Sequence, residues 1–103
     1  MKLVEELDIP ELTSEQNEQL CMLMEEVARE YVLSQVSRKG IETLNASVEV
    51  EGTKPVTLTV DMEVGLSSSI KGVKIQKLVE EAVEVAFKSA ERYLREQKCH
   101  LQK

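Results

Sequence analysis

The stretch from Val56 to Leu66 constrains the fold more than any other part of the chain. Apolar side chains occupy every second position, and the positions between them are mostly polar: Thr57, Thr59, Asp61 and Glu63. A period of two predicts a β-strand with one buried face and one face in water. Residues 41–51 show a shorter alternation of the same kind, and a turn-rich segment follows them. We therefore predict an antiparallel hairpin over residues 41–66.

Two other segments have the period of a helix. Thr13 and Gln16 form a capping-box pattern, apolar residues then recur every three or four positions, and Gly40 follows as a stop signal. The second segment has an apolar face opposite charged pairs spaced four residues apart, such as Glu84 with Lys88. These patterns predict helices over residues 13–40 and 73–98.

Residues 1–12 mix apolar and acidic side chains, and Pro10 favours extended geometry in the residue before it. We interpret them as an N-terminal arm. A helix of about 25 residues spans about 37 Å, similar to an eleven-residue strand, so both helices can cover the hairpin. The predicted fold is a single α+β domain over residues 1–103. It is a two-layer α-β-β-α arrangement in which two long helices cover one face of the antiparallel hairpin.

A two-stranded sheet is marginally stable alone, and both of its outer edges lack a partner. Pairing with a second copy of the chain would satisfy those edges. We therefore predict that dimerisation completes the fold and that the protein is a homodimer.

Composition narrows the class of protein. With 103 residues, 42% apolar and 31% charged, the chain fits one folded domain. No apolar run is long enough to span a membrane, and the acidic N-terminus is unlike a signal peptide. Two cysteines make no disulfide framework, which favours the cytoplasm. The abundance of glutamate is typical of thermostable proteins, although the methionines and glutamines weaken that inference.

Charge is unevenly distributed along the chain. The net charge of −6 makes general nucleic-acid binding an unfavourable interpretation, because such binding depends on basic groups. Residues 41–66 carry −4, with one lysine against five acidic residues. Residues 67–103 carry +3, with eight basic against five acidic residues. The hairpin is thus acidic and the second helix basic, which leaves nucleic-acid binding open at one end only.

The residues that could carry chemistry do not form a recognisable catalytic set. His100 is the single histidine and lies three residues from the C-terminus. Cys99 and His100 supply too few zinc ligands, and Cys21 beside the apolar stripe of the first helix is best explained as a small buried residue. We predict no catalytic residue, no metal site and no cofactor, so the protein is not expected to be an enzyme.

Two groups of residues are candidates for binding a partner. Four acids share the polar face of the hairpin: Glu49, Glu51, Asp61 and Glu63. The simplest explanation is a solvated surface, and the functional one is docking of a basic protein. Tyr31 and Tyr93 lie on the apolar stripes of the two helices, where they either pack in the core or line a partner groove.

A second hypothesis concerns the segment between the hairpin and the second helix. Its hydroxyl-bearing and basic residues are Ser67, Ser68, Ser69, Lys71, Lys74 and Lys77. A hydroxyl-rich loop before a helix start can bind phosphate or sulfate. The segment matches neither GxxxxGK[ST] nor GxGxxG, however. A turn with capping hydroxyls and solvated lysines is the simpler explanation.

The sequence resembles a small archaeal family of proteins of similar length that have no assigned activity. The resemblance rests on residues 9–13, 28–34, 60–64, 66–67, 78–84 and 93–96. It implies a gene near that of the prefoldin beta subunit and near translation or transcription genes, and so a setting in protein homeostasis or information processing. It implies no catalytic residue. A second resemblance, over residues 56–90, is to the alkaline-shock-type domain.

We predict a cytoplasmic, self-associating, non-enzymatic module that binds another protein. The predicted surfaces are the free edge of the strand at residues 56–66 and the acidic face of the hairpin. Strand addition would supply main-chain hydrogen bonds, while the acids would select a basic partner. The alternative is anion or nucleic-acid binding at residues 67–77.

Overall fold

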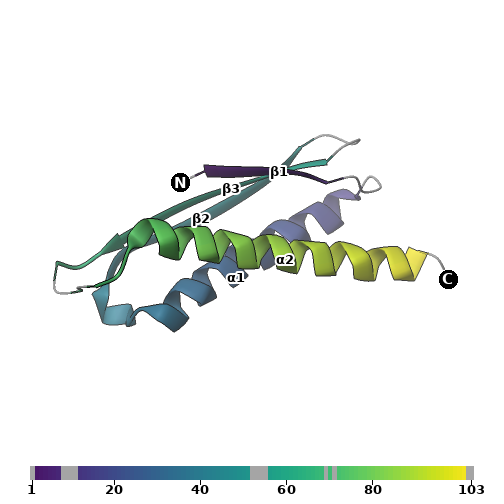
Figure 1. Cartoon of the computed structure of the whole chain (residues 1–103). Coiled ribbons are helices and arrows are strands. Elements are labelled where there is room, and N and C mark those ends of the chain that lie inside the picture. Colours follow the sequence, from purple (N-terminus) through teal and green to yellow (C-terminus); the bar gives the residue numbers. More distant parts are fainter. Residues whose placement is uncertain (1, 8–11, 52–55, 69, 71, 102–103) are drawn as a thin grey trace.

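The computed structural model describes residues 2–7, 12–51, 56–68, 70 and 72–101. Three strands form one layer and two long helices form the other, in a molecule measuring 52 × 22 × 19 Å (Figure 1). In chain order the elements are β1 (Lys2–Leu7), α1 (Ser14–Gln35), the 3₁₀ turn η1 (Arg38–Gly40), β2 (Ile41–Glu51), β3 (Val56–Leu66) and α2 (Ile75–Leu101). The predicted two-layer fold, with two helices over an antiparallel hairpin, is confirmed.

The hairpin has the faces that its alternation predicts. β2 pairs antiparallel with β3, and the register sets Val48 opposite Val60. Val48, Leu58, Val60 and Met62 are buried on the face toward the helices. The intervening acids are exposed on the other face, which we call the outer face.

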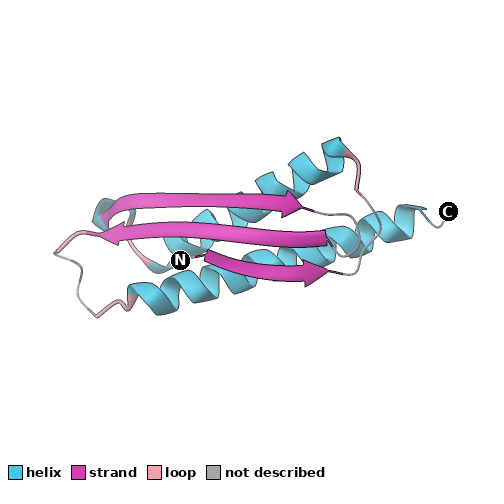
Figure 2. Cartoon of the chain, turned by 90° about the horizontal axis from the view of Figure 1, so that it is seen from above, coloured by secondary structure: helices cyan, strands magenta, loops and turns pink. Residues whose placement is uncertain are grey.

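A third strand was not predicted. Residues Lys2–Leu7 pair antiparallel with Val56–Asp61, so the sheet order is β1-β3-β2 (Figure 2). The expectation that residues 1–12 form only an arm is wrong for this stretch. The predicted free edge on β3 is wrong for Val56–Asp61, because β1 occupies it. The physical reason is that unpaired main-chain groups of a strand favour any extended segment that reaches them.

The first helix begins as predicted and ends earlier. The Thr13 hydroxyl accepts a hydrogen bond from the Gln16 backbone N–H at 3.1 Å, and the Gln16 side chain accepts one from the Thr13 N–H at 2.9 Å. Val36 is already extended, with φ −133° and ψ 137°. Continuing the helix to Gly40 would carry the chain about 7 Å beyond the point where it must turn back into the sheet.

The core lies between the layers. Its helical side chains, all buried, are Leu20, Met24, Ala28, Val32 and Val36 of α1 and Leu78, Val79, Ala82, Val83, Ala86, Ala90 and Leu94 of α2. Burying a large aliphatic side chain contributes about 1.5–3 kcal/mol, whereas the alanines contribute mainly by letting the helices approach. This core fixes where the surface residues of both helices lie relative to the sheet.

Candidate functional site

β2 has one edge that no described strand pairs. It is the outermost strand of the described sheet, and its eleven residues have β3 on one side only (Figure 2). The Val48 backbone N–H points away from β3, because it donates to Glu25 Oε1 of α1 at 3.4 Å. Since such groups alternate along an antiparallel strand, the N–H and C=O of Ala46 and Val50 also point to the free edge.

The edge is only lightly protected. Within the part of the chain that the structure describes, Glu25 is the one side chain that bonds to it, and 3.4 Å is long for such a hydrogen bond. An open edge with unpaired donors and acceptors is a template for another strand. Native proteins commonly cover such an edge, so its exposure here is a functional signal.

A hollow of about 350 Å³ lies beside this edge, between α1 and the end of β2. We call it the edge hollow; its lining residues are Asn17, Glu18, Cys21, Met22 and Val50. Met22 is 67% exposed although it is apolar. The Asn17 Oδ1 atom is buried and has no hydrogen-bond partner among the described residues.

Acidic groups surround the edge hollow. Burial raises the pKa of the Cys21 thiol, and the nearby carboxylates of Glu25 and Glu49 raise it further. These two carboxylates therefore lie close enough to act on the Cys21 thiol, which lines the hollow. The arrangement makes Cys21 a poor nucleophile at neutral pH, because the thiolate is disfavoured.

The four predicted acids share the outer face but do not form a pair. Glu49 faces Thr59 across the ladder, Glu51 faces Thr57, Asp61 faces Ser47 and Glu63 faces Asn45. All four acids are exposed. The result is a field of negative charge in water rather than a buried carboxylate dyad of the kind that acid–base catalysis requires.

The two tyrosines connect the helices. The Tyr31 hydroxyl of α1 donates to Glu81 of α2, and the Tyr93 hydroxyl of α2 donates to Gln19 of α1 at 2.9 Å. The hydrogen bond to Glu81, with smaller effects of burial and of nearby carboxylates, raises the pKa of Tyr31. Burial, followed by the charge of Glu15, raises the pKa of Tyr93. Neither residue lines the edge hollow.

The start of α2 borders a second hollow of about 380 Å³, which we call the start hollow. Its lining residues are Gln35, Val36, Gly72, Val73, Lys74, Lys77, Leu78 and Glu81. Of the predicted anion-binding residues, it thus brings together Lys74 and Lys77. The carboxylate of Glu81 shares the same hollow and opposes an anion there.

Ser67 and Ser68 are not among the described residues that line this hollow. The Ser67 N–H donates to the Gly40 carbonyl at 2.8 Å, and the Ser67 carbonyl accepts from Ile70 at 3.0 Å. The first bond attaches the loop to Gly40 at the end of η1, and the second joins two residues within the loop. Ser68 is exposed, whereas Ser69 and Lys71 lie outside the described residues.

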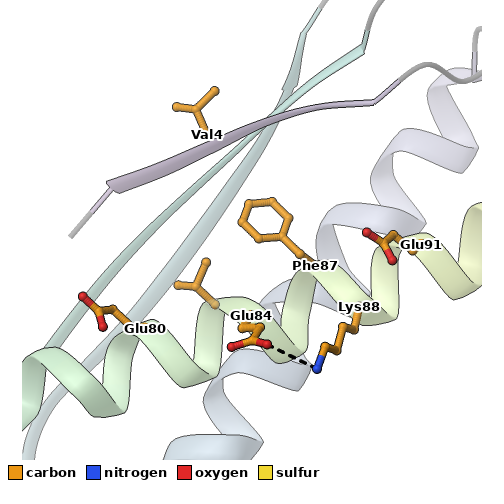
Figure 3. A pocket seen from close by; sticks show the side chains of 7 residues that line it. Val4, Glu80, Glu84, Phe87, Lys88 and Glu91 are labelled. Carbon is orange, nitrogen blue, oxygen red and sulfur yellow. Dashed lines mark ion pairs between the residues drawn. The ribbon is translucent and has the colours of Figure 1, made fainter.

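A third hollow, of about 480 Å³, lies between β1 and α2. Figure 3 shows Phe87 rising from α2 toward β1, while the Val4 side chain points away from the helix. Glu84 and Lys88 form an exposed ion pair of 3.3 Å on its rim. Most of its lining comes from α2, so it is a groove along one helix rather than an enclosed site.

Neither helix is long and apolar enough, in its described part, to cross a membrane. In the same part of the chain, no three His, Cys, Asp or Glu residues are grouped to hold a metal ion. Cys99 and His100 lie within α2, and the structure describes their backbone but not their side chains.

Comparison with known proteins assigns the chain to a family. Residues 9–93 match the model of a family described as "Protein of unknown function (DUF3194)". The chain belongs to this family. An uncharacterised protein from Thermococcus kodakarensis is 26% identical over 90 residues, which cover 87% of this chain and 82% of that protein. The predicted resemblance to an archaeal family of unassigned activity is therefore confirmed at this level.

Two solved structures of archaeal proteins share the fold. A crystal structure from Thermococcus onnurineus has a TM-score of 0.79 at 27% identity, covering 97% of this chain and 96% of that one. The solution structure of a hypothetical protein from Methanothermobacter thermautotrophicus has a TM-score of 0.60 at 24% identity, covering 86% of this chain and 96% of that one. The two-layer architecture is thus not peculiar to this sequence.

The edge hollow was not predicted from the sequence. Met22 offered one signal, since it is an apolar residue outside the buried stripe of its helix. Nothing in the local pattern places Val50 beside Cys21, because the two residues meet only through the packing of α1 on β2.

Proposed function

We propose that the protein is a non-enzymatic interaction module that binds an extended, basic segment of another protein along β2. The observation that carries this proposal is the edge of β2 that no described strand pairs, with acidic side chains along the same strand. Strand addition supplies main-chain hydrogen bonds, and the flanking side chains select the partner.

The charge of β2 supports a basic partner. The strand contains Glu42, Glu49 and Glu51 and no basic residue. All three acids are exposed, so a segment rich in lysine or arginine gains attraction along the edge. Because exposed charge pairs contribute only about 0.2–1 kcal/mol each, we expect them to control selectivity and salt dependence more than total affinity.

The same charges disfavour pairing of two copies through β2. An edge-to-edge dimer would set six glutamates on two adjacent strands with no basic residue between them. β1 also covers part of β3 and so removes one of the two open edges that motivated self-association. Homodimerisation stays a prediction, and light scattering of the purified protein tests it directly.

A labelled peptide tests the proposed function. The probe is a nine-residue peptide in which lysine alternates with threonine, measured by fluorescence anisotropy at low salt. We expect binding that weakens about tenfold in the double variant Glu49→Lys/Glu51→Lys, which reverses the charge beside the edge. Glu80→Lys/Glu84→Lys on α2 makes the same change in net charge away from β2 and should bind nearly as well as the wild type.

Amide NMR signals locate the bound peptide. Strand addition requires the largest shifts at Ala46, Val48 and Val50, whose N–H groups point to the free edge. An absence of binding at low salt, or shifts confined to α2, would contradict the proposed function.

A second candidate function is anion binding at the start hollow. The observation that favours it is the presence of Lys74 and Lys77 on one hollow at the beginning of α2. Titration with inorganic phosphate and with a short RNA tests it, and we expect shifts at Ser68, Gly72 and Lys74. Flat titrations at low salt would reject both an anion site and a nucleic-acid site there.

A further inference from the structure

We infer that the edge hollow receives an apolar side chain from the strand that adds to β2, so that the partner segment alternates apolar and basic residues. The inference rests on the proposed function and specifies the sequence of its ligand. It depends on the position of the hollow, the alternation of a β-strand and the composition of the lining.

The edge hollow lies where an added strand would pass. The hollow joins Val50, whose main-chain groups point to the free edge, to Cys21 and Met22 on the flank of α1. A strand added to β2 directs alternate side chains to the two faces of the sheet. Those on the helix side point down the flank of α1 and into the hollow. Those on the opposite side lie beside Glu49 and Glu51 on the outer face.

The lining decides which side chain fits. Val50, Cys21 and the exposed Met22 form apolar walls, and methionine adapts its shape to different apolar ligands. A volume of about 350 Å³ accommodates an aliphatic side chain of the size of leucine. Glu18 in the lining and Glu49 on the outer face would attract the basic neighbours of that side chain.

Asn17 belongs to the lining and carries an unsatisfied polar atom. Its Oδ1 atom is buried within the lining and accepts no hydrogen bond from any described residue. Buried acceptors are normally satisfied, and an unpaired one calls for an explanation. Because the atom is covered in the free protein, the Asn17 side chain has to turn toward the hollow before an N–H of the added segment can bond to it. The unpaired acceptor costs stability in the free protein, and binding would relieve that cost.

The experiment places one leucine in the lysine–threonine peptide described above, at each threonine position in turn. We expect one position to raise the affinity about tenfold, because burying a leucine side chain provides a gain of that size. Other positions should have little effect. In Val50→Thr and Met22→Gln, which keep the shape of the lining and add polarity, the advantage of leucine should disappear while the threonine peptide still binds.

Controls separate this effect from general damage. Val73→Thr makes the same substitution as Val50→Thr at the start hollow and should leave the leucine advantage intact. Asn17→Ala should weaken peptide binding without lowering the melting temperature, since alanine favours a helix and removes the unpaired acceptor. In a Cys99→Ser background, the leucine peptide should also slow alkylation of Cys21 more than the threonine peptide does.

The outcomes distinguish the two proposals. If basic peptides bind but leucine gives no advantage at any position, the apolar anchor is wrong and the proposed function survives. If no peptide binds, both fail. If the protein alone sediments as a dimer that Met22→Gln dissociates, a second copy fills the hollow and the inference of a foreign strand is overturned.

Discussion

The edge hollow and the start hollow are similar in size but differ in what surrounds them. They lie toward opposite ends of α1, with volumes of about 350 Å³ and about 380 Å³. The edge hollow adjoins open main-chain groups of β2, and acids of one sign surround it. The start hollow combines two lysines with Glu81, which is already bonded to Tyr31. The two hollows therefore differ in the chemistry of their surroundings and not in their size: acids lie around one, and opposite charges meet at the other.

The largest expected effect comes from a substitution in the core that supports both hollows. Leu58 is fully buried in β3, the central strand of the sheet. Leu58→Ala should lower the free energy of unfolding by about 2–5 kcal/mol, because it leaves a cavity between the layers. Chemical denaturation measures the change. Exposed Met22→Ala, as a control, should cost far less, and an equal loss in the two variants would show that the core does not decide stability.

A second substitution should perturb the start hollow alone. A β-carbon at Gly40 would collide with the Ile70 side chain, so Gly40→Ala displaces the loop that leads into α2. We expect a loss of about 1–3 kcal/mol in unfolding free energy, with peptide binding at β2 unchanged. The double variant Gly40→Ala/Ile70→Ala should recover part of the loss. If it recovers nothing, the contact with Ile70 is not the cause.

A third substitution should strengthen the edge. Glu25→Ala releases the Val48 N–H for pairing with an added strand and removes a long hydrogen bond. The cost in unfolding free energy should be below about 1 kcal/mol, while the affinity for the basic peptide rises several-fold. Glu26→Ala removes an exposed neighbouring acid that has no bond to the edge. Loss of its charge alone should leave the affinity unchanged or slightly lower, so an equal rise in this control would show that the freed N–H is not the cause.

The smallest effect concerns Tyr31 beside the start hollow. Its pKa is raised on folding, chiefly by the hydrogen bond to Glu81. Stability from this bond is therefore fully present below the ordinary tyrosine pKa of about 10 and is lost as the pH rises through the higher folded pKa. Melting temperatures measured from neutral to strongly alkaline pH should fall less steeply in Tyr31→Phe than in the wild type. Parallel curves would exclude this linkage.

The sequence alone determined both helices, the hairpin and the acidic outer face. Each of these depends on a short period: three to four residues for the stripe that contains Leu20 and Met24, and two residues for Leu58, Val60 and Met62. Hydrophobic burial imposes those periods locally, so they can be read without knowing what packs against them. The capping box at Thr13 was visible for the same reason.

Only the tertiary structure decided which strand has the free edge. Pairing of Lys2 with Asp61 joins residues far apart in the chain, and the mixed arm gives no local signal of it. This pairing places β3 in the centre and leaves β2 outside. The edge hollow likewise needs Val50 to pack beside Cys21. Such contacts depend on the closure of long loops and on which main-chain groups are left unpaired, which no local pattern encodes.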